Sequence, residues 1–338
     1  MSEINHKSEA FLCQICNSSE HRVLFNSKTT ELGDIVRCAG CGFVTVHPMP
    51  SEAFIAQSYN GLYKGRESLD RVDPVKSQQV QRTFDAYLRG VGKKGLEPKA
   101  FLDVGGGLGY FSGSAIKYGL EATLIDLDNE SLDFAKGVLG VSKVFQGTLE
   151  TFAAQTAEKY DLILLRHEIE HLPDPATIMK GIANLLSENG LAIVETPNNA
   201  SFEAFLHPNL KRNFVKNLSK YYEGINHNSI VKKKVYAMRP PIHLNAFSMK
   251  TLIKIGEKNG LTEVDNFTYK LGDKDYWPNF KLPTIRKVVK HLVKFRFGAA
   301  LQEVQGIIKF VVGRELLSKN NYSGLHIKVK LKTPSSNC

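Results

Sequence analysis

The sequence contains no apolar run near the ~18 residues that a transmembrane helix needs, although 42% of its 338 residues are hydrophobic. The polar start, MSEINHKSEA, does not have the pattern of a secretory signal. Internal repeats and low-complexity tracts are also missing, which excludes a repeat architecture. We therefore expect a cytoplasmic chain with reduced thiols, folded as one large domain or a main domain with an appendage.

Acidic residues are scarce in the C-terminal part of the chain. Residues 201–338 contain 25 Lys and Arg against 9 Asp and Glu, a balance of +16, whereas residues 1–200 contain 19 against 25, a balance of −6. Together these give the formal net charge of +10. The excess indicates an anionic partner, such as a sugar-nucleotide phosphate, an acidic glycan, a membrane surface or RNA. A solvated lysine-rich face is the alternative.

Four of the five cysteines form two C-x-x-C pairs, CQIC and CAGC, at Cys13, Cys16, Cys38 and Cys41. Each pair offers two thiolates from one tight turn, and together they make the tetrahedral sulfur set that Zn²⁺ prefers. Gly40 and Gly42 ease the second turn. Because four thiolates leave no coordination position open, we expect a structural zinc ribbon over residues 1–50. Disulfides and a redox C-x-x-C are the alternatives.

Strand and helix patterns alternate between residues 98 and 200. The expected strands cover 101–104, 121–127, 142–147, 160–165 and 191–197. Asp174 is expected to cap a helix that runs to Gly190. Two more strands follow at 261–269 and 325–332, the latter antiparallel with its lysines facing solvent. This order predicts an α/β fold with a doubly wound, seven-stranded, mostly parallel sheet, whose ligand lies at the carboxyl ends of the strands.

The glycine-rich stretch after the first strand lacks one residue of the dinucleotide fingerprint. In G-x-G-x-x-G/A the third small residue allows close helix packing, and here that position is Tyr110. The pattern present is D-x-G-x-G-x-G, formed by Asp103, Gly105, Gly107 and Gly109. Asp126 ends the second strand, at a suitable separation to accept hydrogen bonds from ribose hydroxyls. That acid alone fits NAD and S-adenosylmethionine equally well.

Four stretches of the chain, taken together, resemble the class I S-adenosylmethionine-dependent methyltransferases. They are FLDVGGGLGYF, LIDLDNESLDFA, YDLILLRHEIEHLPDP and RPPIHLNAFS. The resemblance implies that Asp103 and the glycine loop hold the methionine end of the donor, and that Asp126 binds the ribose. Further donor-site residues implied after the next three strands are Leu127, Thr148, Leu149 and Arg166. Residues 148 and 149 would flank the adenine, and Arg166 would line the floor of the pocket.

The segment HEIEH, residues 167–171, matches the H-E-x-x-H pattern of zinc metalloproteases. That chemistry needs a long helix, with His167 and His171 on one face as metal ligands and Glu168 as the base. Here the segment follows a buried strand directly, and Pro173 limits any helix to about one turn. We interpret the match as coincidental. In a methyltransferase the segment would border donor and acceptor, with His171 over the reacting centre; a capping or packing role is the alternative.

Residues 200–241 form no clear sheet unit and are expected to be a lid over the acceptor. His243 then lies before a helix that Ser248 should cap and Gly260 should end. The order of ribbon, PMPSEAFIAQSYNGLYK and donor domain resembles the zinc-containing sugar methyltransferases of bacterial carbohydrate pathways. Their carbon-methylating members carry an acid where this chain has Ile242. The resemblance therefore favours O-methylation of a nucleotide-linked or cell-envelope sugar, or a similar small molecule that is anionic or a sugar nucleotide, with His243 or His171 as general base.

The stretch 283–317 has apolar residues at helical spacing among Lys and Arg, so it fits either its own domain or an anionic membrane surface. The zinc ribbon and the basic half also suit an RNA methyltransferase, but LRHEIEH lacks the base-binding N/D-P-P-Y/F motif and a Pro-Cys nucleophile, so a nucleic-acid substrate is disfavoured. A non-enzymatic binding module should have lost the donor residues, which are present. We divide the chain into a ribbon (1–50), a connector (51–97), a methyltransferase core (98–270) and a C-terminal region (271–338).

Overall fold

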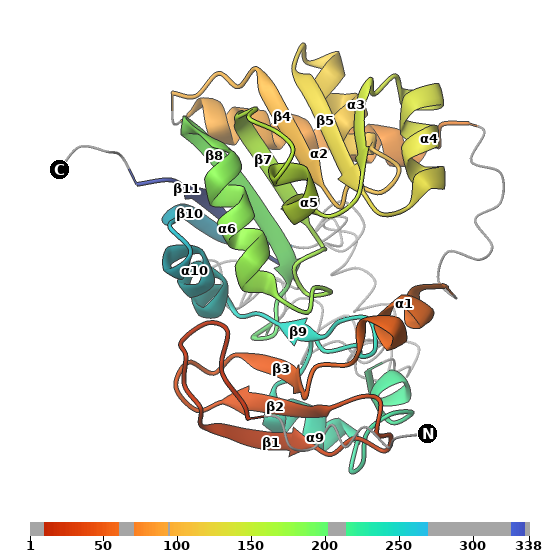
Figure 1. The fold of residues 1–338 in the computed structure, drawn as a ribbon, viewed down its shortest axis with the longest axis vertical. Coiled ribbons are helices and arrows are strands. Elements are labelled where there is room, and N and C mark those ends of the chain that lie inside the picture. The colour runs from red at the N-terminus through yellow and green to blue at the C-terminus, as the bar shows by residue number, and fades with distance from the viewer. Residues whose placement is uncertain (1–9, 61–70, 94, 202–213, 270–325, 335–338) are drawn as a thin grey trace, which may run out of the picture.

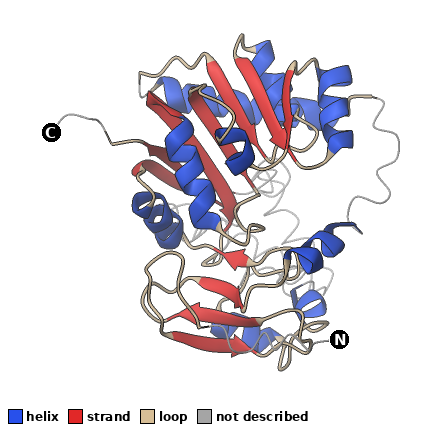
Figure 2. Cartoon of the chain, viewed as in Figure 1, coloured by secondary structure: helices blue, strands red, loops and turns tan. Residues whose placement is uncertain are grey.

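The computed structural model describes residues 10–60, 71–93, 95–201, 214–269 and 326–334. Within these ranges the strands form two sheets, a large one flanked by helices and a small one near the N-terminal end (Figures 1 and 2). The predicted stretch 283–317 lies outside the described residues. No helix in the described parts of the chain has the length and apolar character to cross a bilayer.

The larger sheet has seven strands in the order β10-β11-β8-β7-β4-β5-β6. Neighbours from β8 to β6 are parallel, while β11 pairs antiparallel with both β8 and β10. This arrangement confirms the predicted doubly wound, mostly parallel sheet. The strands are β4 (Ala100–Val104), β5 (Glu121–Asp126), β6 (Lys143–Gln146), β7 (Tyr160–Arg166), β8 (Leu186–Pro197), β10 (Thr262–Tyr269) and β11 (His326–Lys332).

Helices cover both faces of this sheet because its central strands are apolar on both sides. Alternate residues of β4 and β7 belong to different hydrophobic clusters: Phe101 and Leu162 face one layer, and Leu102 and Ile163 the other. One layer contains α2 (Pro74–Gly92), α3 (Tyr110–Lys117) and α4 (Asn129–Leu139). The other contains α5 (Leu149–Ala153), α6 (Pro175–Leu185) and α10 (Met249–Lys258).

Two of these helices begin where the sequence predicted. The Asp174 carboxylate accepts hydrogen bonds from the first turn of α6, and Ser248 caps α10 in a reciprocal arrangement with Thr251. The predicted end of α6 was wrong, because the helix stops at Leu185 and β8 begins at Leu186. Gly190 therefore lies in the strand. A Cβ there would lie 2.8 Å from the carbonyl oxygen of Tyr160, so close approach of β7 requires the glycine.

The lysines of β11 do not face solvent, which corrects the prediction for this strand. Lys328 and Lys330 are only 7% and 5% exposed. The reason is that β11 lies inside the sheet rather than at its edge, under α2, where the Lys328 ammonium lies 4.4 Å from the Tyr87 ring centroid. Lys328 pairs with Glu195 at 3.3 Å, and Lys330 pairs with Asp265 at 3.1 Å. The alternation of lysines along the strand predicted contact with water, but the two ammonium groups are instead paired with carboxylates.

The smaller sheet combines three strands near the N-terminal end with one strand from residues 245–246. Its order is β1-β2-β3-β9, formed by β1 (His21–Phe25), β2 (Asp34–Cys38), β3 (Val44–His47) and β9 (Asn245–Ala246), with α1 (Glu52–Asn60) and α9 (His227–Lys233) nearby (Figure 1). Apolar residues of β1–β3 share one cluster with residues 214–246, including Leu218, Tyr222 and Met238. The described part of the predicted lid is thus packed on the ribbon. The domain boundaries themselves stay a prediction.

Glu195 of β8 should be a major source of stability. Its carboxylate is fully buried and binds Tyr87 Oη at 2.6 Å, Arg166 Nε at 2.9 Å and Lys328 Nζ at 3.3 Å. Glu195→Ala would remove the buried carboxylate that Lys328, Arg166 and Tyr87 share, so we expect a loss of about 3–5 kcal/mol in the free energy of unfolding. Denaturant unfolding measures this.

The matched control is Glu121→Ala, which removes an exposed partner of Lys143. It should change the free energy of unfolding by less than about 1 kcal/mol. Equal effects of the two substitutions would contradict a structural role for the buried network.

Candidate functional site

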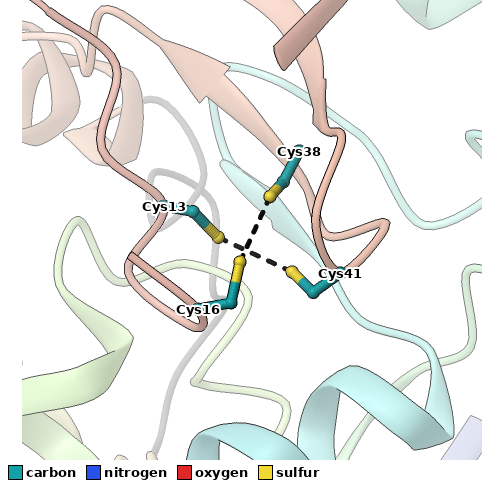
Figure 3. Close-up of side chains that lie close together, drawn as sticks. All are labelled: Cys13, Cys16, Cys38 and Cys41. Carbon is teal, nitrogen blue, oxygen red and sulfur yellow. Dashed lines mark hydrogen bonds between the residues drawn. The ribbon is translucent and has the colours of Figure 1, made fainter. Parts of the chain in front are cut away.

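The four cysteines of the two C-x-x-C pairs converge, as the sequence predicted (Figure 3). Their sulfur atoms all lie within 4.8 Å of one another, with Cys13 Sγ 3.6 Å from Cys41 Sγ and Cys16 Sγ 3.4 Å from Cys38 Sγ. A disulfide would need about 2.05 Å. Four sulfurs around Zn²⁺ at about 2.3 Å would be about 3.8 Å apart, so this donor set fits a tetrahedral zinc site.

The two turns have matching backbones. In each, a residue just past the pair takes a left-handed conformation: Asn17 at φ 58° and Gly42 at φ 80°. The predicted role of Gly40 is refined, because a Cβ there would lie 3.1 Å from Cys16 Sγ, so its small size lets the two turns approach. The ribbon is anchored to α10 through Lys258, whose ammonium donates to the Gln14 carbonyl at 2.7 Å.

The glycine loop lies between the carboxyl end of β4 and the start of α3. Gly105, Gly107 and Gly109 all have left-handed backbones, at φ 64°, 54° and 72°. These conformations explain the spacing of the motif, since residues with a Cβ rarely adopt them. Gly106, which the motif did not single out, is equally constrained: a Cβ there would lie 2.5 Å from both the Asp103 carboxyl carbon and Leu124 Cδ1.

Two predicted carboxylates frame this loop. Asp103 is buried and accepts a hydrogen bond from Ser112 Oγ at 2.9 Å. Burial, with a further contribution from the nearby Asp126 charge, raises the pKa of Asp103 to about 7. Asp126 accepts hydrogen bonds from the backbone N–H of Gly107 at 2.7 Å and of Asp128 at 2.9 Å. Asp126 therefore orders the loop, and its role toward a ribose stays a prediction.

The other predicted donor-site residues differ in whether their side chains are exposed or already engaged with other parts of the protein. Leu127 is exposed beside Asp126, and Thr148 caps α5 through its hydroxyl. The side chain of Leu149 is 1% exposed and packs toward Gly181 of α6, so the predicted contact with an adenine, which stays a prediction, would involve its backbone. Arg166 at the end of β7 forms the ion pair with Glu195, while its guanidinium carbon lies 5.2 Å from the centroid of the Phe111 ring.

Glu168 is a member of this site that sequence reasoning missed. Its carboxyl group lies against the loop, since a Cβ on Gly105 would be 2.8 Å from Glu168 Cδ. Burial, and then the charges of Asp126 and Glu170, raise the pKa of Glu168 to about 8. The sequence signal was present, but the residue was considered only as the base of a metalloprotease motif.

His171 and His243 were each predicted as a candidate catalytic base. They are 72 positions apart in the sequence, and the structure brings their side chains together. Their ring centroids are 4.8 Å apart and nearly perpendicular. His171 Nδ1 lies 3.2 Å from the Ile242 carbonyl oxygen, and His243 Nδ1 lies 2.9 Å from that of Ala237. A carbonyl only accepts, so both Nδ1 atoms carry the proton and both Nε2 atoms present lone pairs. Burial lowers the pKa of His171, and lowers that of His243 to about 4.

Glu170 lies beside the two rings. Its Oε1 is 3.8 Å from His171 Nε2 and 3.5 Å from His167 Nδ1, while its Oε2 accepts from Thr196 Oγ1 at 2.9 Å. Burial alone would raise the pKa of Glu170, but the surrounding histidines outweigh burial and hold it at about 2. The side chain is an ionised carboxylate inside the protein, stabilised by its neighbours.

The H-E-x-x-H segment is not helical, which confirms that the metalloprotease match was coincidental. His167 has a left-handed backbone at φ 55°, and residues 169–171 form a turn between β7 and α6. The geometry of a zinc-binding helix is therefore absent from this segment. What the sequence did not reveal is that the same turn brings Glu170 to His171 and His243.

Comparison with protein families gives one match across most of the region described above. Residues 77–266, more than half of the chain, match a family described as a methyltransferase domain. Among curated proteins, a ubiquinone biosynthesis O-methyltransferase of Proteus mirabilis is 29% identical over 177 residues, 51% of this chain and 65% of that protein. One of Aeromonas salmonicida is 36% identical over 108 residues, 31% of this chain and 45% of that protein.

The chain thus matches less than two thirds of the length of these relatives. Among solved structures, an S-adenosylmethionine-dependent methyltransferase from Archaeoglobus fulgidus aligns with a TM-score of 0.44 at 16% identity. The alignment covers 75% of this chain and 94% of that one.

The raised pKa of Asp103 predicts how the stability of the ligand-free protein depends on pH. Between about pH 4 and 7 the carboxyl group ionises in the unfolded chain but stays protonated in the fold. The free energy of unfolding should therefore fall with rising pH by roughly 1.4 kcal/mol per unit from this group. Above about pH 7 both states are ionised and the contribution is constant.

Asp103→Asn keeps an acceptor for Ser112 and removes the titration. We expect its stability relative to wild type to improve as the pH rises from 4 to 7, measured by urea unfolding across that range. A difference between the two proteins that does not change with pH would contradict the assignment.

Proposed function

Because the chain belongs to the class I S-adenosylmethionine-dependent methyltransferases, we propose that it transfers the donor's methyl group to a hydroxyl oxygen of a small molecule. The observation that carries this proposal is the pair His171 and His243 at the end of β7. Glu168, three residues before His171, lies against the donor loop. Each imidazole has a nitrogen lone pair close to the expected position of the sulfonium. Such a lone pair can activate a weakly acidic hydroxyl by accepting its proton.

Methyl transfer is an in-line displacement, so the acceptor oxygen, the methyl carbon and the sulfur must align and water must be excluded. We propose that Asp103, Asp126 and the glycine loop bind the donor, and that Glu168 belongs to the same binding site. Carboxyl groups around the loop, with Asp103 buried and Asp126 and Glu168 half-buried, favour a cationic donor over a neutral one. On the acceptor side, His171 Nε2 or His243 Nε2 is the candidate general base, since backbone carbonyls hold both rings with this nitrogen unprotonated.

For the acceptor, we propose a nucleotide-linked or cell-envelope sugar. Polar groups dominate this side of the site: Glu170 and the two histidines lie next to Arg239, whose charge acts on both rings. Arg239 is exposed and would attract a negatively charged acceptor. The names of the curated relatives supply the second candidate, a precursor of ubiquinone. Ile242 at the position of the expected acid supports O-methylation over C-methylation.

We further propose that the cysteine quartet binds a structural zinc ion. The site would fix the two turns of the ribbon and hence β3, which hydrogen-bonds to the acceptor-side segment through β9. Four ionised thiolates persist only where thiols are reduced, which supports a cytoplasmic location.

The function is tested by turnover of purified protein, followed as S-adenosylhomocysteine formation with a panel of sugar nucleotides and ubiquinone precursors. With the acceptor that reacts, His171→Ala and His243→Ala should each lower kcat, by up to ~10²–10⁴-fold for the residue that acts as base. Calorimetry should show unchanged affinity for S-adenosylmethionine.

His21→Ala, an exposed ribbon histidine, serves as the control and should keep wild-type turnover. Full activity in both site variants would remove the histidines from the mechanism. Turnover confined to ubiquinone precursors would replace the sugar with the second candidate.

Zinc in the ribbon is tested by metal analysis. Cys16→Ser removes one of the four thiolates and should abolish the ribbon zinc and lower the thermal unfolding temperature, because metal binding contributes to folding. Cys338→Ser, outside the quartet, should leave zinc content and stability unchanged. Equal zinc in the two variants would argue against the site.

A further inference from the structure

Three side chains at the turn after β7 present their polar atoms to one point. One atom each from Glu170, His171 and His243 lies within 4.8 Å of the others. Glu170 Oε1 is 3.8 Å from His171 Nε2, and the two rings are 4.8 Å apart at an interplanar angle of 84°. The cluster is separate from the cysteine quartet, and the mechanism proposed above uses only its imidazoles as bases.

Both histidines are oriented in the way that metal-binding histidines usually are. Each donates its Nδ1–H to a backbone carbonyl, that of Ile242 for His171 and that of Ala237 for His243. A metal-bound histidine almost always uses its second ring nitrogen in this manner, which fixes the tautomer and aims the other lone pair. His171 Nε2 lies 3.8 Å from Glu170 Oε1, and a ring nitrogen of His243 lies within 4.8 Å of both groups, so the three side chains form a preorganised donor set.

The carboxylate supplies the second, independent observation. Glu170 is 1% exposed, and its Oε1 receives no hydrogen bond within the described residues. Its nearest polar neighbours, His167 Nδ1 at 3.5 Å and His171 Nε2 at 3.8 Å, are beyond good hydrogen-bonding distance. A buried carboxylate oxygen that receives no hydrogen bond keeps an unused acceptor position, which a bound cation would fill. The oxygen is aimed at the two imidazoles.

We propose that Glu170, His171 and His243 bind a divalent transition-metal ion, with Zn²⁺ as the closest chemical match. Two imidazole nitrogens and one carboxylate oxygen are a donor set of catalytic zinc sites, which keep a further position open for water or substrate. Ligand bonds of about 2.0–2.2 Å would bring the three atoms to about 3–3.4 Å apart. The present separations, from 3.8 Å up to 4.8 Å, would close through side-chain shifts of about 0.5–1.5 Å, to which several side chains contribute.

The role of the ion rests on the proposed methyl transfer, and the ion would take over the activation of the hydroxyl that was assigned above to a histidine base. The acceptor hydroxyl would bind at the open position, where the metal lowers its pKa and its proton passes to solvent. The oxygen then attacks the methyl carbon. The new O–C bond forms as the C–S bond breaks, and both electrons of that bond go to sulfur, which leaves as a neutral thioether. The histidines are then ligands, and neither accepts the proton.

The site is tested on full-length protein whose ribbon is already loaded with zinc. After brief dialysis against EDTA, the protein is titrated with Co²⁺, and visible absorption and metal content are measured. Wild type should bind one ion beyond the ribbon zinc, with the spectrum of nitrogen and oxygen ligation rather than of thiolates. Glu170→Gln, His171→Gln and His243→Gln should each weaken this ion at least ~10-fold.

His167→Asn is the matched control. It contacts the same carboxylate from outside the donor set, and asparagine tolerates the left-handed backbone. It should bind Co²⁺ like wild type. No second ion in wild type, or equal binding by all three ligand variants, overturns the proposal. Full turnover after removal of the second ion would overturn its catalytic role, whereas metal binding without turnover of any acceptor would count against the proposed function alone.

Discussion

Asn245 joins three parts of the chain that are far apart in sequence, and the placement of His243 beside His171 and Glu170 depends on this junction. Its amide nitrogen donates to the Leu172 carbonyl at 2.6 Å, and its amide oxygen accepts from Thr45 of the ribbon at 2.8 Å. The backbone N–H groups of Leu244 and Asn245 both donate to the Glu170 carbonyl, at 2.9 and 3.0 Å. Because Asn245 is fully buried, these bonds are shielded from competing water.

This junction explains why a cysteine ribbon is attached to a methyltransferase fold. The ribbon strand β3 pairs with β9, and β9 follows His243 by two residues. Any shift of the ribbon relative to the sheet would move His243 away from His171. The ribbon thus braces the segment that carries His243, and the proposed closed four-sulfur zinc site would suit that purpose, because such a site resists deformation without taking part in chemistry.

Charge divides the site into two halves. Around the glycine loop, burial raises the pKa of Asp103 to about 7 and that of Glu168 to about 8, which favours the neutral forms of these carboxyl groups in the ligand-free protein. Beyond the turn after β7, Glu170 stays ionised among histidines. Glu168 and Glu170, which belong to the two environments, are only two positions apart in the chain. Their difference arises from the side chains that pack around each carboxylate.

The sequence by itself determined the sheet, the glycine loop and the cysteine quartet. Each depends on local patterns: apolar runs for buried strands, glycines at left-handed positions, and thiolates spaced for one tight turn. It misjudged Lys328 and Lys330, because alternation along a strand does not reveal what covers its face. It also treated His171 and His243 as separate candidates and dismissed Glu170 with its motif. Only the tertiary structure decided that these three meet, since a turn and a distant loop share no periodicity that a sequence can display.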